Sequence, residues 1–108
     1  SVIIESVGLA DGSEIPKSYK IHQNYPNPFN PVTTLRYDLP EDGLVNITVY
    51  DMMGRVIKNL VNVQQNAGYK SIQWNGTNNG GQSVSAGLYF YTIQSQDFVK
   101  TKKMILLK

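Results

Sequence analysis

The residues that most often perform catalysis are scarce in this sequence of 108 residues. It contains one histidine, His22, eight acidic residues and no cysteine. A Ser–His–Asp arrangement would need His22, which lies just before a proline-rich segment, and an exposed or strand-edge histidine is the interpretation that this position favours. Without cysteine there is no disulfide, thiolate metal site or cysteine nucleophile, and one histidine gives no histidine-based metal cluster. We therefore expect no enzymatic activity and no cofactor.

The acidic residues and the asparagine-rich segment do not combine into a site either. Glycoside hydrolysis needs two carboxylates that converge on a cleft, and the spacing of the eight acids brings no such pair together. Residues 75–80 follow the outline of a calcium-binding loop, but every carboxylate of that motif is missing, and Ala86 stands where the motif ends in glutamate. A polar hairpin loop is the interpretation that these residues favour.

The aromatic residues provide the alternative to a purely structural domain. Most of them should lie in the core or form cross-strand pairs. Tyr50, Tyr69 and Phe90 are the ones that we expect to face outward, where exposed aromatic rings can stack on sugars. A carbohydrate-binding or adhesive accessory module of a secreted glycoside hydrolase is therefore the alternative function, with carbohydrate as the alternative partner.

Short strands are the elements that must position these residues. Residues 33–39 and 44–51 alternate between apolar and polar side chains, which is the pattern of half-buried strands. Residues 40–43, Pro-Glu-Asp-Gly, form a turn, because proline presets one dihedral angle and glycine accepts a positive φ. We predict that the two strands form a hairpin.

The remaining runs indicate an all-β fold. Further strands are predicted at 56–63, 69–74, 88–93 and 98–107; residues 56–64 also fit a helical face, but their β-branched side chains favour a strand. This count predicts an immunoglobulin-like antiparallel β-sandwich of about seven strands with Greek-key crossings. Tyr89 occupies the place of the tyrosine that bonds to the preceding corner in such sandwiches, and Tyr91 occupies the core position two residues later.

Length and charge limit the classes of partner. The length supports one domain, at residues 19–108. Residues 1–18 are interpreted as a linker, or a loose first strand at 2–4, from an upstream domain, so we expect the chain to be a piece of a larger protein. The net charge of +2 is too small to indicate nucleic-acid binding, and no apolar run approaches the ~20 residues of a membrane span.

The basic excess is concentrated at the end of the sequence. Residues 97–108 carry a charge of +3, whereas the rest of the chain carries −1. Lysines can protect an exposed edge strand from pairing with other molecules, or they can form part of a recognition surface. The charges alone leave both interpretations open.

Several motifs resemble those of one known family. Residues 24–31, Asn-Tyr-Pro-Asn-Pro-Phe-Asn-Pro, are similar to the opening of the type A C-terminal sorting domain of the Bacteroidetes type IX secretion system. The resemblance continues through residues 49–56, Val-Tyr-Asp-Met-Met-Gly-Arg-Val, then 67–68, 74–77 and 85–91, and ends at 102–108. It covers residues 23–108, with Asn75 where family members often have aspartate. Residues 74–93 also resemble the immunoglobulin-like domain of the flagellar hook-capping protein.

The resemblance implies a function in protein transport. Such domains lie at the C-terminus of larger secreted proteins and carry them through the periplasm and across the outer membrane by way of the type IX translocon. The implied partners are the translocon, shuttle and sortase proteins and the upstream cargo domain of the same chain. The product is secreted or held at the cell surface. A surface sortase commonly cleaves the linker, here expected before about Tyr19, where exposed backbone is accessible to a protease.

The resemblance also assigns roles to individual residues. The positions implied in recognition of the sorting signal are Lys102, Lys103, Met104, Ile105, Leu106, Leu107 and Lys108. The positions implied in the structure of the family motifs are Pro26, Asn27, Pro28, Gly54, Arg55, Gly68, Gly87 and Tyr89. We further expect the final strand to present its lysines and its edge to the secretion machinery, with strand addition as the docking mode.

Overall fold

The computed structural model describes residues 14–107, and this part of the chain forms strands, turns and loops. The predicted strand at residues 2–4, most of the predicted linker and Lys108 lie outside the described residues. The strands are β1 (Lys20–Ile21), β2 (Thr33–Leu39), β3 (Gly43–Tyr50), β4 (Val56–Gln65), β5 (Gly68–Trp74), β6 (Gly87–Ser95) and β7 (Phe98–Leu106). The all-β prediction is confirmed, and the run with a helical face belongs to β4. Among the described residues no helix could cross a membrane.

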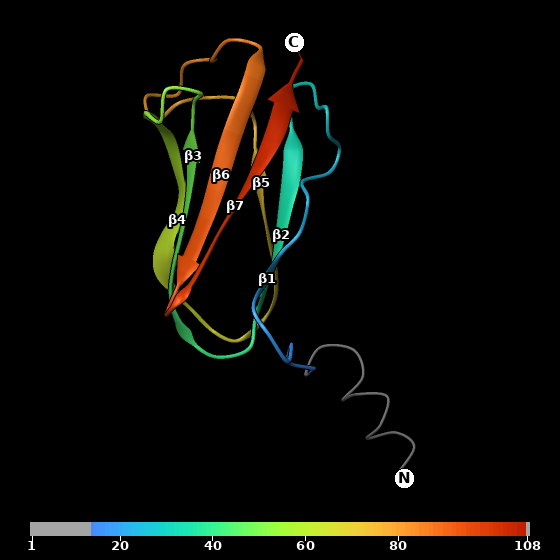
Figure 1. The fold of residues 1–108 in the computed structure, drawn as a ribbon, viewed down its shortest axis with the longest axis vertical. Coiled ribbons are helices and arrows are strands. Elements are labelled where there is room, and N and C mark those ends of the chain that lie inside the picture. The colour runs from blue at the N-terminus through green and yellow to red at the C-terminus, as the bar shows by residue number, and fades with distance from the viewer. Residues whose placement is uncertain (1–13, 108) are drawn as a thin grey trace, which may run out of the picture.

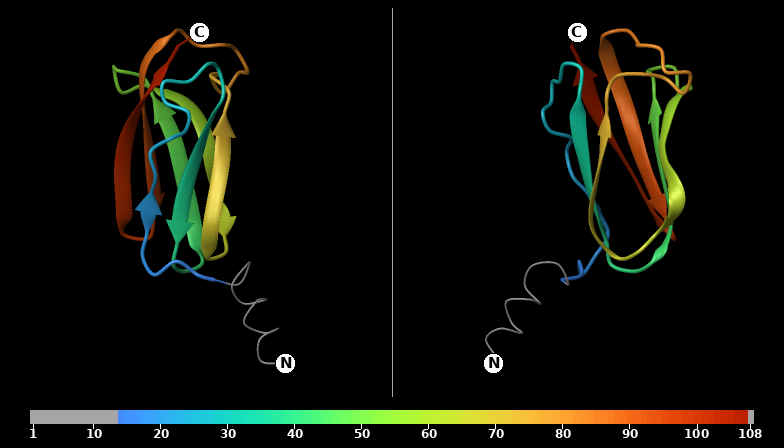
Figure 2. Two further views of the ribbon diagram at one scale, coloured as in Figure 1. Left: turned by 90° about the vertical axis from the view of Figure 1, so that its right-hand side faces the viewer. Right: turned by 180° about the vertical axis from the view of Figure 1, so that it is seen from behind.

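The strands form two antiparallel sheets that pack face to face (Figures 1 and 2). One sheet has the order β1-β2-β5 and the other the order β4-β3-β6-β7. The chain passes from one sheet to the other after β2, after β4 and again after β5, as in a Greek-key sandwich. The predicted immunoglobulin-like sandwich is therefore confirmed.

The predicted hairpin between the first two main strands is wrong. β2 pairs with β1 and β5, whereas β3 pairs with β4 and β6, so the turn at residues 40–43 joins the two sheets. The Asp42 carboxylate accepts a hydrogen bond from the Ala67 amide at 2.8 Å, which ties this turn to the connection between β4 and β5. Period-two alternation identifies the buried face of a strand but not its partner, and the buried faces of β2 and β3 meet across the interior.

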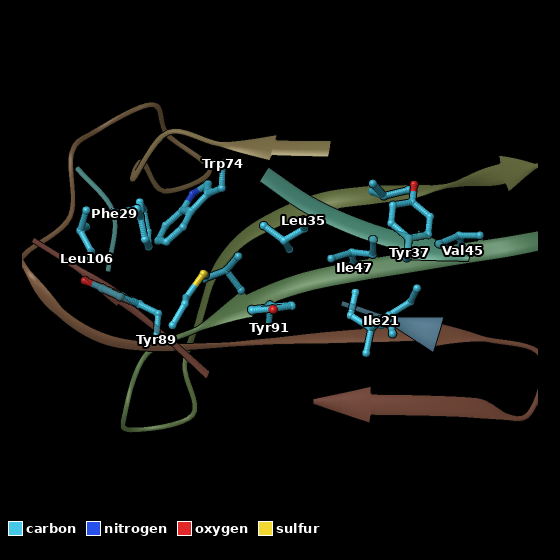
Figure 3. Packing of buried hydrophobic residues seen from close by; sticks show 14 of the residues in the cluster. Ile21, Phe29, Leu35, Tyr37, Val45, Ile47, Trp74, Tyr89, Tyr91 and Leu106 are labelled. Atoms are coloured by element: carbon cyan, nitrogen blue, oxygen red, sulfur yellow. The ribbon is translucent and has the colours of Figure 1, made fainter. Parts of the chain in front are cut away.

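The core lies between the sheets and follows the alternation of the strands (Figure 3). On β2 and β3 the apolar side chains expected to point inward are fully buried. The largest fully buried side chains are Trp74, Tyr37, Tyr91, Phe29, Leu35, Leu39, Ile47, Ile93, Met104, Leu106, Val45 and Val49. Tyr91 thus takes the core position predicted for it. The core therefore receives side chains from β7 and from the irregular segment before β2 as well as from the central strands.

The two ends of the sandwich carry different parts of the chain. At the top of Figure 1 lie the turn after β3, the loop after β5, the segment before β2 and the end of β7; we call this end the distal pole. The described chain enters at the opposite end, beside the turn that joins β6 to β7. Motifs that are scattered along the sequence are therefore gathered at the distal pole.

Candidate functional site

The two segments that carry the strongest sequence motifs lie against each other at the distal pole. Residues 23–31, which we call the proline segment, run beside the end of β7 (Figure 2, left). Phe29 donates a backbone hydrogen bond to the Ile105 carbonyl at 3.0 Å and accepts one from the Leu107 amide at 2.8 Å. The peptide bonds before Pro26, Pro28 and Pro31 are cis. A short parallel pairing between Phe29 and Leu106 thus extends the four-stranded sheet.

Side chains of the proline segment continue this contact along the strand. The Asn27 side-chain oxygen accepts a hydrogen bond from the Ile105 amide at 3.0 Å. The Gln23 amide donates to the Lys103 carbonyl at 2.9 Å. The expectation that the final strand exposes its edge therefore needs a correction at residues 103–107, where the proline segment occupies that edge.

The other half of the β7 edge stays open within the described chain. Alternate residues of an edge strand direct both backbone groups away from the sheet, which makes Val99 and Thr101 the counterparts of Lys103 and Ile105. No backbone group among residues 14–107 bonds to the outward groups of Val99 and Thr101. Any strand that adds to β7 without displacing the proline segment has to add here.

Two lysines of β7, Lys102 and Lys103, lie where the open part of its edge meets the part that the proline segment covers. Lys103 is exposed on the outer face of the sheet, and Lys102, half-buried, alternates to the opposite face. Within residues 14–107 the two ion pairs are His22–Asp38 and Arg55–Asp51, and neither uses a lysine of β7. The charges of Lys102 and Lys103 are therefore available to a partner, as far as the described residues show. Lys108, the last predicted recognition residue, lies outside the described part of the chain.

A buried hydrogen-bond network fixes the start of the proline segment. The Tyr91 hydroxyl donates to the His22 carbonyl at 2.9 Å and accepts from the Asn24 amide at 2.8 Å. The Asn24 side chain donates to the Thr33 hydroxyl at 3.0 Å and to the Pro26 carbonyl at 3.1 Å. Burial raises the pKa of Tyr91 to about 12, so its hydroxyl remains a donor at neutral pH.

Three aromatic rings pack against one another at the distal pole. The ring of Phe29 lies 5.8 Å from that of Trp74, which in turn meets Tyr89 edge-on at 5.4 Å (Figure 3). The Tyr89 hydroxyl donates to the Ser85 carbonyl at 2.6 Å, so the hydrogen bond expected of a tyrosine corner is present. These rings come from three different motifs and connect the proline segment to β5 and β6.

The turn after β3 is held by its aspartate. One carboxylate oxygen of Asp51 accepts from the amides of Met53 and Arg55, and the other accepts from the Arg55 guanidinium at 2.9 Å. The backbone hydrogen bond from Arg55 is the main cause that lowers the pKa of Asp51. Gly54 has a φ of 84°, in the left-handed region that favours glycine. Gly87, with a φ of 146°, begins β6.

The side chains named for sugar binding are not all on one surface. Tyr50 and Phe90 are neighbours in the β3–β6 register and lie half-buried on the outer face of the four-stranded sheet. Tyr69 is 62% exposed on β5, in the other sheet. A platform of these three residues is therefore not formed. Tyr25, 77% exposed at the distal pole, was not among the residues expected to face outward.

Gln23 is the contact residue that the sequence interpretation missed. No local pattern marks it, because its partner Lys103 lies 80 positions away. In the asparagine-rich loop, the Asn78 side-chain oxygen accepts from the amides of Gly80 and Gln82, as in a polar loop stabilised by its own side chains. Residues 14–107 contain no group of three histidine or acidic side chains arranged to hold a metal ion.

Comparison with known proteins extends the structural findings. The family model of the FlgD Ig-like domain matches residues 31–97. No curated protein matches the chain. Among solved structures, FlgD from Xanthomonas campestris, from work on the hook capping essential for flagellar assembly, is 19% identical, with a TM-score of 0.57; the match covers 97% of this chain and 74% of that one.

Two further neighbours come from Porphyromonas gingivalis. Dimeric latent PorU is 23% identical, with a TM-score of 0.64, over 85% of this chain. PorZ, an essential bacterial surface component of the type IX secretion system, is 16% identical, with a TM-score of 0.57, over 92% of this chain. The chain spans only 10% of PorU and 13% of PorZ. At these identities the likeness establishes a shared fold.

Proposed function

The chain belongs to the FlgD Ig-like domain family, and we propose that within this family it is a C-terminal sorting domain of the type IX secretion system. In this role it directs a larger cargo protein across the outer membrane, to the medium or the cell surface. Its partners are the translocon, the shuttle proteins and a sortase. It acts as a recognised substrate and supplies no catalytic group.

The observation that carries this proposal is the contact between the proline segment and the end of β7. The family match covers residues 31–97, so almost all of the proline segment and all of β7 lie outside it. These two segments are also the ones whose residues resemble the opening and the end of a sorting domain. Their backbone pairing makes them one surface, which supports a joint role in recognition.

Two of the similar structures support a role in type IX secretion. PorZ is a surface component of the type IX secretion system, and PorU has the highest TM-score of the neighbours compared above. FlgD shares the same sandwich, with a TM-score equal to that of PorZ, so the fold alone does not distinguish transport from flagellar assembly. The proline segment and β7 favour transport, because they carry sorting-domain motifs and lie almost entirely outside the FlgD Ig-like family match at residues 31–97.

The arrangement of the two poles fits a signal that is read while cargo is attached. Cargo on the N-terminal side joins at the end opposite the distal pole, so Lys102, Lys103 and the proline segment stay accessible. Tyr19 is anchored by stacking on Phe98 at 5.2 Å and by a hydrogen bond to Glu41. Lys17 and Ser18, just before Tyr19, are exposed and lie outside the strands, which supports sortase cleavage on that side.

A reporter experiment tests the proposal. A fluorescent reporter fused ahead of residues 1–108 should reach the surface or the medium of a bacterium that has a type IX secretion system. Deletion of residues 104–108 should leave the reporter in the periplasm. Normal surface delivery by this truncated fusion would contradict the proposal.

A second pair of variants separates recognition from folding. Met104 and Leu106 are fully buried, so the truncation also weakens the core. Lys102→Ala with Lys103→Ala removes charge and leaves these side chains in place, and it should reduce delivery. Lys70→Ala with Lys20→Ala is the matched control on the three-stranded sheet, with one half-buried and one exposed lysine. Equal delivery by both pairs, at equal melting temperature, would argue against a role for the β7 lysines.

A further inference from the structure

The outer face of the four-stranded sheet carries an ordered pattern of polar side chains. The strand register aligns the outward side chains in three rows, two of them mainly polar and the third mainly apolar and aromatic, each with one residue from each strand. From β4 through β3 and β6 to β7, the rows are Asn62-Asn46-Gln94-Val99, Asn59-Thr48-Thr92-Thr101 and Val56-Tyr50-Phe90-Lys103. On β3 these residues alternate with Val45, Ile47 and Val49, which are fully buried, so the rows face away from the core.

This surface, which we call the polar face, is almost free of charge. The chain has ten basic and eight acidic residues, yet Lys103, at one corner, is the only charged side chain in the three rows. A nucleic acid or an acidic protein would find little charge complementarity here. The polar face therefore suits a neutral partner.

The polar face is rich in groups that form hydrogen bonds. The Thr48 hydroxyl donates to the Asn46 side-chain oxygen at 2.8 Å, and the hydroxyls of Thr92 and Thr101 are 2.7 Å apart, so some of these groups are already oriented. The side-chain amides of Asn59 and Gln94 have no protein partner among residues 14–107, and both are exposed. An amide presents donors and an acceptor together, as a ligand with many hydroxyl groups requires.

The third row offers an apolar contact. Tyr50 and Phe90 lie side by side, half-buried, where a sugar ring can cover them. A shallow hollow of about 360 Å³ beside the third row is lined by Gln23, Phe90, Thr101, Lys102 and Lys103. Another of about 310 Å³ lies beside the first row, where Leu44, Asn46 and Gln94 line it. The three rows extend over ~13 Å along a strand, which suits an elongated chain better than a single small molecule.

We propose that the polar face binds a neutral polysaccharide chain. Hydroxyl groups of the ligand bond to the exposed amides of Asn59, Asn62 and Gln94, and one sugar ring rests on Tyr50 and Phe90. A protein partner fits less well, because the centres of protein interfaces favour aromatic residues, methionine and arginine over amides that need individual partners. This binding is separate from the proposed transport function: Asn59, Asn62 and Gln94 lie outside the proline segment, and Lys103 is the residue that the three rows share with the proposed recognition surface.

Affinity electrophoresis of the full chain tests this proposal. The gels contain a soluble β-glucan, a xylan or a galactomannan, and alginate serves as the anionic comparison. We expect retardation by at least one neutral polysaccharide and little change with salt, because no ionic attraction is involved. Absence of retardation by all three neutral polysaccharides would overturn the proposal, and retardation by alginate alone would do the same.

Paired variants locate the binding surface. Asn62→Ala with Gln94→Ala removes two exposed amides and should weaken binding about tenfold. Tyr69→Ala with Gln73→Ala is the matched control, with an exposed aromatic ring and an exposed amide on the outer side of β5. Equal weakening by the control pair would overturn the assignment to the polar face. Reporter delivery should be unchanged in Asn62→Ala with Gln94→Ala. The carbohydrate proposal and the transport proposal can therefore be refuted separately.

Discussion

At Tyr91, one buried hydroxyl joins parts of the chain that are almost 70 positions apart. It bonds to the backbone of His22 and Asn24 and so fixes the place where the proline segment begins. Position in the sequence predicted that Tyr91 would be buried, because it follows Tyr89 on an alternating strand. Its hydrogen-bond partners were not predictable, since a buried hydroxyl can be satisfied by any nearby carbonyl.

Replacing Tyr91 with phenylalanine should give a pH-dependent loss of stability. The pKa of Tyr91 is about 12 in the folded state, against 10.0 for the unperturbed side chain, so its contribution is complete below pH 10 and is lost as the pH rises toward 12. The difference in unfolding free energy between the wild type and Tyr91→Phe should therefore shrink over this range. Urea unfolding at about pH 8 and about pH 11 measures it. A difference in unfolding free energy that is the same at both pH values would contradict the raised pKa of Tyr91.

Gly54 allows a second prediction that depends on the backbone alone. An alanine Cβ at this position would meet no atom within 4 Å, but the φ of 84° disfavours any residue with a Cβ. Gly54→Ala should lower the unfolding free energy by about 1–2 kcal/mol. Gly80→Ala, where φ is not positive and the nearest atom is 3.4 Å away, is the control and should cost much less in thermal or urea unfolding. Equal costs would refute this explanation.

At the scale of the elements, alternation and turn residues predicted most of the strands. The predicted and observed ends of β2 coincide, and those of β3 differ by one residue. The partners of these strands were not predictable in the same way: the turn at 40–43 was interpreted as a hairpin but crosses between sheets. Local chemistry specifies where a chain turns, whereas the packing of two buried faces decides which sheet the next strand joins.

The covered edge of β7 depends on equally distant contacts. Asn27 and Ile105 are 78 positions apart, and the proline segment has no periodic pattern that would indicate pairing. The resemblance to the sorting-domain family indicated that both the proline segment and the end of β7 matter for function. It did not indicate that one covers the edge of the other.

Hydrogen exchange should reveal this boundary along β7. The amides of Ile105 and Leu107 are bonded to the proline segment and should exchange slowly, whereas those of Val99 and Thr101 point away from the sheet and should exchange fast. Asn27→Ala should speed exchange at Ile105 and cost about 1 kcal/mol of stability. Asn30→Ala is the control in the same segment. Similar exchange at Val99 and Ile105 in the wild type would contradict the described pairing.

At the scale of the whole molecule, the sandwich is a compact body that begins near Tyr19, and the described residues just before it lie outside the strands. Lys17 and Ser18 are exposed and lie outside the strands, whereas Lys20 is paired in β1. Limited digestion with trypsin should therefore cut first after Lys17 and leave residues 18–108 intact. Mass spectrometry of the early products identifies the cut. A first cut inside the sandwich, for example after Arg55, would contradict a body that begins near Tyr19.

The distal pole brings together residues from the proline segment, the turn after β3, the loop after β5 and the end of β7. Sequence motifs identified these segments one by one, and the fold makes them neighbours. The central claim is that this end of the molecule, together with the rest of the sandwich, is sufficient to send an attached protein through the type IX secretion system.

One measurement tests that claim most directly. A fluorescent reporter fused ahead of residues 1–108 is produced with a signal for export to the periplasm, in a bacterium with an intact type IX secretion system and in a mutant that lacks its translocon. We predict that the reporter reaches the surface or the medium in the intact strain and accumulates in the periplasm of the mutant. Retention of the reporter in the periplasm of both strains, or equal release from both, would contradict the claim.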